Sequence, residues 1–420
     1  MSQQILVNVP RSRSPLRVSE PQHLQWSGRW TRWQVRTSGP DQFPSELWFA
    51  VEPEYRGMLA TGSDAALLGL LIPAMRQGVD LVLDGSVSVS LLEQARGELQ
   101  AMLRTALPGL QRVHISAQGR AAPEPVSTAV GLGFSAGIDA LCSVLQHREP
   151  DLPRGHLASP PAPDHLQFFN VGSHGVNGRD VFEARRGRIT DAAAALGFPL
   201  VVLDSNLDDF FDLSFQMTHV LRNAAAAHVL SGGMGVALMS STGVPLWDGR
   251  QHVRDLAQAD HLLLPACSSE RLVLTSAGAS LSRVEKTRLV AGHPVSFRIL
   301  DVCQKSRVQP GNCSSCRKCL RTMLTLDVLG RLDEYEHVFD IRRYRRLRPL
   351  YAAYVWIAGL PLADEVLAFA RAERFAPVLA ARRWRWLARL AVCAWRVFDR
   401  LTRRLPAGLH RRLRRTWNSI

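Results

Sequence analysis

Two patterns of hydrophobic and polar positions follow one another along the chain. Aromatic and β-branched runs over residues 26–56 predict strands, and the apolar run SDAALLGLLIPAMRQG predicts a helix over residues 63–78. A buried strand (VDLVLDG), an amphipathic helix (VSVSLLEQARGELQAMLRTAL) and a last strand (LQRVHISA) follow. These elements predict a small α+β domain over residues 26–119, preceded by a polar, flexible segment over residues 1–25.

After a linker over residues 117–128, short apolar segments alternate with amphipathic ones. The apolar segments are AVGLGF, LQFFNV, LVVLDS and GVALMSS. This alternation predicts an α/β fold with a parallel sheet that is covered by helices on both faces. Ligands of such sheets bind at the carboxyl ends of the strands, where the first turn, SAGID, is expected to lie.

Composition changes this picture only near the end of the chain. The 420 residues include 46% hydrophobic and 21% charged residues, which is ordinary for a globular protein. Neither a secretory signal nor an apolar stretch of about 18 residues is visible, which predicts a cytoplasmic protein. The net charge is +14, but residues 341–420 carry +15 and the first 340 residues sum to −1. The basicity therefore belongs to a C-terminal extension.

The turn SAGID has the small residues of a phosphate-binding loop. Gly133, Ser135, Ala136 and Gly137 let the backbone approach a ligand, and the helix that follows would direct its N-terminus at an anion. The sequence is neither a Walker A loop nor a GxGxxG fingerprint. Spacing alone therefore leaves phosphate binding and a simple strand-to-helix turn open.

Four of the seven cysteines lie close together in the sequence. Cys303, Cys313, Cys316 and Cys319 are spaced C-x9-C-x2-C-x2-C. Thiolates at this spacing can converge on one tetrahedral Zn²⁺, and four sulfur ligands would make the site structural. An iron–sulfur cluster and an unrelated group of core cysteines are the alternatives.

The loop and the cysteines together carry a resemblance to a known family. FSAGIDA resembles the SGGxDS loop of the PP-loop ATP pyrophosphatase (adenine nucleotide alpha hydrolase) superfamily, which has a parallel sheet of the HUP type. NCSSCRKCLRTM resembles the zinc-binding quartet of 7-cyano-7-deazaguanine synthase and the NCGxCEKCLRTM motif of uncharacterised relatives. The similarity covers residues 128–330, which are therefore expected to be an ATP-binding catalytic domain with a zinc knuckle.

The resemblance implies roles for particular residues. Ser135, Gly137 and Asp139 match the family pattern for binding phosphates, whereas Ala136 and Ala140 replace its second glycine and its serine. A positive φ at Ala136 would cost about 1 kcal/mol. Lys286 and Arg283 would place positive charge on the phosphates, with a solvated helix face as the alternative.

Further candidates follow the second strand and lie on a later helix. Ser173 and His174 follow LQFFNV, where the family holds nucleotide or substrate. Arg222 and His219 are one helical turn apart and are candidates for binding a carboxylate or phosphate, with a purely structural contact as the alternative.

The implied activity is an ATP- and Mg²⁺-dependent adenylation that releases pyrophosphate. The acceptor would be a carboxylate or amide oxygen of a small-molecule acid or a nucleobase, and ammonia, an amine or sulfur would displace AMP. Two alternatives are a tRNA or base thiolase of the same fold and a non-catalytic nucleotide-binding scaffold.

The extension over residues 341–420 is predicted to be helical. In VLAARRWRWLARLAVCAWRVFDRLTRRL, the arginines fall on one side of a helix and Trp384, Leu387, Trp395 and Phe398 on the other. Over residues 378–416 this pattern suits an anionic membrane surface, which would place the protein at the inner face of the membrane. A helix docked on the body and an RNA-binding segment are the alternatives.

Overall fold

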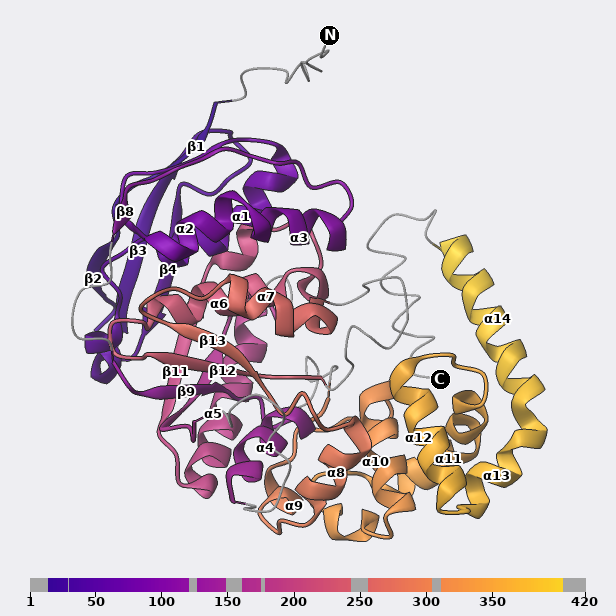
Figure 1. Ribbon diagram of the computed structural model, residues 1–420. Helices are drawn as coiled ribbons and strands as arrows, with labels where there is room; N and C mark the ends of the chain where they lie inside the picture. Colours follow the sequence, from indigo (N-terminus) through magenta and orange to yellow (C-terminus); the bar gives the residue numbers. More distant parts are fainter. Residues whose placement is uncertain are drawn as a thin grey trace. The chain divides into compact units, whose positions relative to one another are not determined.

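The computed structural model describes residues 14–28, 30–120, 127–148, 161–174, 178–242, 256–303 and 311–402. The chain divides into two compact units, which are coloured along the sequence in Figure 1. Unit 1 comprises the residues up to Ser282 together with Ile299–Asp301, and unit 2 comprises Arg283–Arg298 and the residues from Val302 onward.

One half of the sheet in unit 1 is parallel. Its strands are β9 (Val130–Gly133), β10 (His165–Phe169), β11 (Leu200–Ser205), β12 (Val236–Ser240) and β13 (Val273–Ala277). They lie in the order β13-β12-β9-β10-β11, and every neighbouring pair is parallel. The four predicted strands are confirmed, and β13 is an additional strand.

The direction of winding reverses between β9 and β12. The chain runs outward from β9 through β10 to β11, and then returns to the other side of β9 to form β12 and β13. Helices α4 (Ile138–Leu145) and α5 (Arg179–Leu196) consequently lie on one face of the sheet, and α6 (His219–Val229) and α7 (Asp260–Ala266) lie on the other (Figure 1). The predicted parallel sheet with helices on both faces is confirmed.

The other half of the sheet is mainly antiparallel and joins the first half directly. The strand β4 (Glu46–Val51) pairs antiparallel with β11, and the order continues through β3, β1, β5 and β7, with β2 pairing on β3. These strands are β1 (Leu16–Val18), β2 (Gln22–Trp26), β3 (Trp30–Ser38), β5 (Leu81–Leu83) and β7 (Ile115–Ser116). The strands β6 (Val87–Ser88) and β8 (Gly119–Arg120) form a separate pair.

Strands from residues 26–119 and from residues 128–282 thus belong to one sheet and to one unit. The helix α1 (Asp64–Gln77) is buried from Asp64 to Met75 and packs against α6, so both halves share one hydrophobic core. The predicted amphipathic helix is interrupted at Gly97, between α2 (Val89–Arg96) and α3 (Glu98–Ala106). Within the predicted flexible segment, β1 and most of β2 are ordered by pairing with β3, while residues 1–13 lie outside the described part.

Unit 2 is helical in its described residues. It contains α8 (Arg283–Ala291), most of α9 (Ser296–Ile299), α10 (Arg317–Val328), α11 (Ile341–Val355), α12 (Pro361–Ala372), α13 (Ala376–Ala381) and α14 (Arg385–Thr402). The predicted helical extension is therefore confirmed up to Thr402, but it belongs to one unit with residues 283–298 and 311–340. The Tyr344 hydroxyl of α11 donates to Asp327 of α10 at 2.9 Å, and Arg348 donates to the same carboxylate at 3.0 Å.

Short 3-10 turns connect many of these elements: η1 (Pro53–Met58), η2 (Gln146–Arg148), η3 (Leu207–Phe210), η4 (Phe215–Met217), η6 (Leu256–Ala259), η7 (Leu332–Tyr335) and η8 (Arg382–Trp384). Among the described helices, none combines the length and the apolar character that crossing a membrane requires.

Candidate functional site

The loop between β9 and α4 adopts a constrained backbone conformation. Ala136 has φ +55° and is 1% exposed, so an alanine occupies the left-handed position where the family pattern has glycine. The Ala136 carbonyl oxygen accepts a hydrogen bond of 2.8 Å from the backbone N–H of Asp301. This bond fixes the loop at the residue that carries the strain.

Asp301 is in turn held by two arginines of α5. Arg188 donates to the Asp301 carboxylate, and the Nε atom of Arg185 lies 3.7 Å from it. The Asp301 side chain is 5% exposed, so this carboxylate is buried beside the two guanidinium groups. Sequence reasoning missed these three residues because more than 110 positions separate Asp301 from the arginines.

The N-terminus of α4 carries no side-chain cap. The helix follows Gly137, whose φ of −79° and ψ of 171° are extended, and Asp139 lies in its first turn. A Cβ atom on Gly137 would meet Ser135 Oγ at 3.4 Å and the Asp301 carbonyl oxygen at 3.6 Å, which are ordinary contacts. Neither its backbone angles nor its neighbours therefore require glycine. Ser135 is exposed, so its hydroxyl can reach a ligand at the helix N-terminus, and Asp139 is half-buried in the first turn.

The loop after β10 brings further polar groups to the same edge of the sheet. Ser173 is exposed, but His174 is 3% exposed and packs edge-on against the stacked rings of Phe168 and Phe182, with centroids 5.7 and 5.5 Å away. His174 Nδ1 lies 3.2 Å from Asn170 Oδ1. Of the two predicted residues, only Ser173 presents its side chain to solvent.

The ends of β10 and β11 are joined by hydrogen bonds. Asn170 Nδ2 donates to Asp204 Oδ1 at 2.6 Å, and Ser205 Oγ donates to the Asn170 carbonyl at 2.7 Å. Arg179, which is 57% exposed, donates to the other oxygen of Asp204 at 3.0 Å. On the far side of β9, Ser240 Oγ at the end of β12 donates to the Gly133 carbonyl at 3.4 Å. The carboxyl ends of four parallel strands thus form one polar edge.

The side chain of Arg222 is buried and makes hydrogen bonds with neighbouring residues of unit 1. It is 1% exposed; Nε donates to Thr218 Oγ1 at 2.8 Å, and Nη1 donates to the Val171 carbonyl at 3.1 Å and to Asp208. Nη2 donates to the Leu213 carbonyl at 3.3 Å. The pKa of Arg222 lies below its usual value, because burial lowers it by more than the hydrogen bond to Asp208 raises it. The guanidinium group is occupied by the chain itself, which favours the structural alternative for this residue.

Lys286 and Arg283 belong to α8 in unit 2, whereas the loop residues belong to unit 1. Lys286 is 1% exposed, and Arg283 is half-buried. The burial of Lys286 excludes the solvated helix face that was its alternative.

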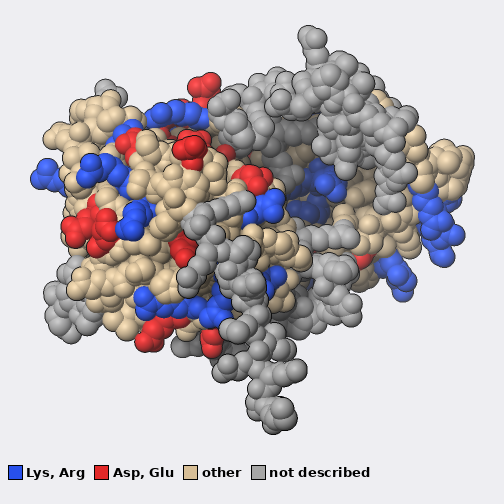
Figure 2. All heavy atoms as spheres, turned by 90° about the horizontal axis from the view of Figure 1, so that it is seen from above, with Lys and Arg blue, Asp and Glu red and all other residues tan. Residues whose placement is uncertain are grey.

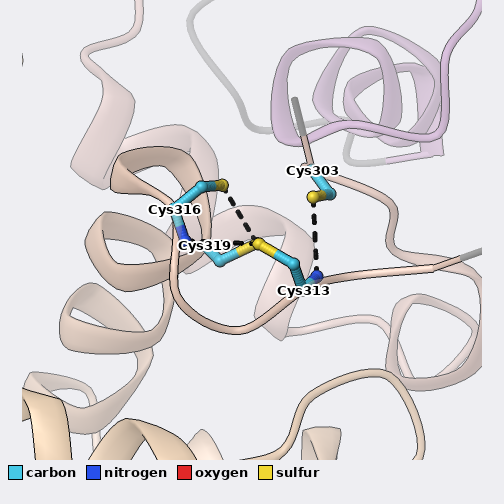
Figure 3. Close-up of side chains that lie close together, drawn as sticks. All are labelled: Cys303, Cys313, Cys316 and Cys319. Atoms are coloured by element: carbon cyan, nitrogen blue, oxygen red, sulfur yellow. Dashed lines mark hydrogen bonds between the residues drawn. The ribbon is translucent and has the colours of Figure 1, made fainter. Parts of the chain in front are cut away.

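The four cysteines in unit 2 form a compact group (Figure 3). Their Sγ atoms all lie within 4.8 Å of one another. Sγ of Cys319 lies 3.5 Å from that of Cys316 and 3.9 Å from that of Cys313. Sulfurs around one tetrahedral zinc, at about 2.3 Å from it, are about 3.8 Å apart. The quartet could therefore hold a metal ion such as zinc.

Backbone groups support this arrangement. The N–H of Cys316 donates to Cys313 Sγ at 3.3 Å, and the N–H of Cys313 donates to Cys303 Sγ at 3.5 Å. The neighbouring thiols, that of Cys303 first, lower the pKa of Cys313, and the Cys303 thiol also lowers that of Cys316 to about 6. Cys303 and Cys319 have raised pKa values, mainly because thiols compete for the same protons. A bound cation would favour the thiolate form at all four positions.

The knuckle is fixed to the rest of unit 2. Asn312 Oδ1 accepts from the Val302 N–H at 2.8 Å, and its Nδ2 donates to the Val338 carbonyl at 3.1 Å. Ser314 has φ +54° and is fully buried, and its hydroxyl accepts from the Asp340 N–H at 2.9 Å. These bonds connect the cysteine segment to the start of α11.

The backbone strain at Ala136 gives a first prediction. The Ala136→Gly variant should raise the free energy of unfolding of unit 1 by about 1 kcal/mol, because glycine adopts a positive φ without the clash of a Cβ atom. Urea denaturation followed by circular dichroism measures the change. As a matched control, Ala140→Gly in α4 should lower stability by about the same amount. Equal destabilisation by both variants would contradict the conformation described for the loop.

Comparison of the chain with protein-family models, with curated proteins and with solved structures gives no match.

Proposed function

We propose that this protein is an ATP-dependent adenylating enzyme of the PP-loop type. The observation that carries the proposal is the position of the SAGID loop, which follows β9 where the strand order reverses. That point is where open α/β sheets bind their ligands. The left-handed residue 136 and the N-terminus of α4, where Gly137 provides no side-chain cap, both favour an anionic group there.

The residues of the loop suit a triphosphate. The backbone N–H groups at the start of α4 and the hydroxyl of Ser135 would donate to phosphate oxygens. Asp139 would hold Mg²⁺ together with those oxygens, since this ion commonly uses one or two carboxylates and substrate phosphates. Bound Mg²⁺ would neutralise charge on the pyrophosphate that leaves.

The reaction makes a poor leaving group into a good one. An oxygen of the substrate attacks the α-phosphorus of ATP, and the bond from that phosphorus to pyrophosphate breaks. Ammonia, an amine or a sulfur nucleophile then displaces AMP from the activated carbon. Lys286 and Arg283 are the proposed cationic partners of the phosphates on the basis of the sequence pattern.

The low net charge of the first 340 residues favours a small molecule as the acceptor. The first 340 residues sum to −1, and acidic and basic side chains are interspersed over unit 1 on the face shown in Figure 2. Nucleic-acid binding is dominated by positive charge along the phosphate backbone, which such a surface does not provide. A carboxylic acid or a nucleobase is therefore the proposed substrate class.

For the quartet we propose a single structural Zn²⁺. Two sulfurs on one ion cannot be farther apart than twice the metal–sulfur distance, about 4.6 Å. The sulfurs here lie close to that limit or within it, whereas an iron–sulfur cluster inserts several atoms between them. Four thiolates leave no open position for substrate, so the ion would stabilise the fold.

Burial of the two cysteines of unit 1 argues against the thiolase alternative. Cys142 and Cys267 of unit 1 are both 0% exposed, and burial raises the pKa of Cys267. A sulfur carrier needs an accessible thiol of lower pKa. The scaffold alternative rests on Ala136 and Ala140, and only an activity measurement separates it from catalysis.

The test is ATP–pyrophosphate exchange, measured against a panel of carboxylic acids and nucleobases. Asp139→Asn should reduce exchange about a hundredfold, since it removes the proposed ligand charge for Mg²⁺. Asp191→Asn on the exposed surface of α5 is the matched control and should have no effect. The double variant Ala136→Gly, Ala140→Ser restores the family pattern and should raise exchange.

Two outcomes would contradict the proposal. Tight ATP binding with no exchange for any acceptor, and none in the restored double variant, would favour the scaffold. Calorimetry that detects no binding of MgATP to the full chain would exclude both.

A further inference from the structure

The helix α14 presents a row of large apolar side chains to solvent. Trp386, Leu390 and Val397 are 53%, 59% and 56% exposed. They are spaced by four and seven residues, so they lie on one side of the helix, and the exposed Cys393 falls in the same row. The apolar side that was predicted from the sequence contains Trp384 and Leu387, and the row described here lies on a different side of the helix.

Another side of the helix is turned toward its own unit. Ala388 is 2% exposed, and α14 contacts α11 and η8. The apolar row therefore remains exposed after α14 has packed on its unit, at least against the residues that the structure describes. A contiguous row of exposed apolar side chains is typical of a surface that binds a partner or a membrane.

Basic side chains border the apolar row. Arg385 and Arg389 are exposed and are one helical turn apart, and each precedes a residue of the row by one position. Arg382 and Arg383 extend the basic side into η8, where Arg383 stacks on Trp384 at 5.2 Å. Residues 382–402 hold six arginines and one acid, Asp399.

We propose that α14 binds an anionic lipid bilayer, lying in the plane of the interface. The row of Trp386, Leu390 and Val397 would enter the boundary between headgroups and acyl chains, and the flanking arginines would contact lipid phosphates. The helix has 18 residues and is about 27 Å long, so it can lie along the surface. This proposal is independent of the adenylation reaction.

The combination of features selects a bilayer over other polyanions. RNA would be attracted by the arginines, but the aliphatic residues Leu390 and Val397 would gain nothing from a phosphate backbone. A membrane surface uses both: charge attracts the helix, and apolar burial keeps it there. Dependence on both groups of residues is therefore the property to measure.

The exposed Cys393 offers a direct readout in the full chain. An environment-sensitive fluorophore on Cys393 should shift to shorter wavelength on addition of phosphatidylcholine vesicles that contain phosphatidylserine. Vesicles of phosphatidylcholine alone should produce little or no shift. Protein with Cys393→Ser, treated with the same reagent, corrects for labelling at other cysteines.

Sedimentation with the same vesicles tests the two groups of side chains separately. Arg385→Gln with Arg389→Gln should weaken binding about 25-fold, at about fivefold for each arginine. Trp386→Ala with Leu390→Ala should weaken it at least about tenfold. The control is Leu350→Ala, which truncates a 55% exposed leucine on α11 of the same unit and should leave binding unchanged.

Three results would overturn the proposal. The first is absence of binding to the anionic vesicles. The second is binding that the arginine variant abolishes and the Trp386, Leu390 variant leaves unchanged, as expected for RNA; filter binding with tRNA would then identify that ligand. The third is a dimer, detected by light scattering without vesicles, that the Trp386, Leu390 variant dissociates.

Discussion

Replacing Cys316 by serine is expected to abolish metal binding by the cysteine quartet and to unfold much of unit 2. Cys316 directly precedes α10, so its thiolate would connect the ion to the helix that packs against α8, α11 and α12. Binding of a structural zinc ion supplies about 10–16 kcal/mol for the folding of zinc-finger peptides at pH 7. Unit 2 also has packed helices, and we expect the loss here to be several kcal/mol.

The measurements are metal content by mass spectrometry and limited proteolysis of the full chain. The wild-type chain should contain about one zinc, whereas Cys316→Ser should contain none and should be cleaved within residues 283–402. Cys393→Ser is the matched control, because it removes an exposed cysteine from the same unit and should change neither property. Iron with visible absorbance would identify a cluster instead, and two disulfides in a metal-free protein would exclude any metal site.

Local sequence patterns predicted most of the parallel half of the sheet. The strands β9 to β12 are short apolar runs between helical patterns, which is the pattern of buried parallel strands. The strand β13 was missed because it lies at the end of the sheet, and its first residue, Val273, is 51% exposed. An edge strand of this kind lacks the continuous apolar run of its neighbours.

The extent of unit 1 depends on pairing that no local pattern encodes. The register of Asp204 opposite Ala50 joins segments that are about 150 residues apart and turns two expected domains into one sheet.

Contacts between residues far apart in the sequence also limited what could be predicted of the site. Cysteine spacing predicted a compact quartet, because its members are close in sequence. The contact between Asp301 and Arg188 crosses more than 110 residues and has no local signal.

Replacing Arg222 by methionine is expected to destabilise unit 1 by about 3 kcal/mol, because buried acceptors lose their donor, whereas the Asp208 side chain is 30% exposed and can be solvated. The variant retains much of the side-chain volume but leaves the carbonyls of Val171 and Leu213 without the guanidinium donors that they have now. Urea unfolding of the full chain measures the change, and hydrogen exchange should locate it in the loop after β10 and in α6.

The matched control is Arg179→Met, which removes another arginine–aspartate pair of the same unit. Arg179 is 57% exposed, so its bond to Asp204 should contribute no more than about 1 kcal/mol.

A substitution at Gly172 tests the position of the Arg222 side chain independently. Gly172 has φ +106°, and a Cβ atom there would clash with Arg222 Nη1 and with Asp208 Oδ1. Gly172→Ala should therefore be destabilising alone and less so in the Arg222→Met background, where the clash with Arg222 is gone but the contact with Asp208 and the backbone strain remain. Strictly additive effects in this double-mutant cycle, or equal losses for Arg222→Met and Arg179→Met, would contradict the role assigned to Arg222.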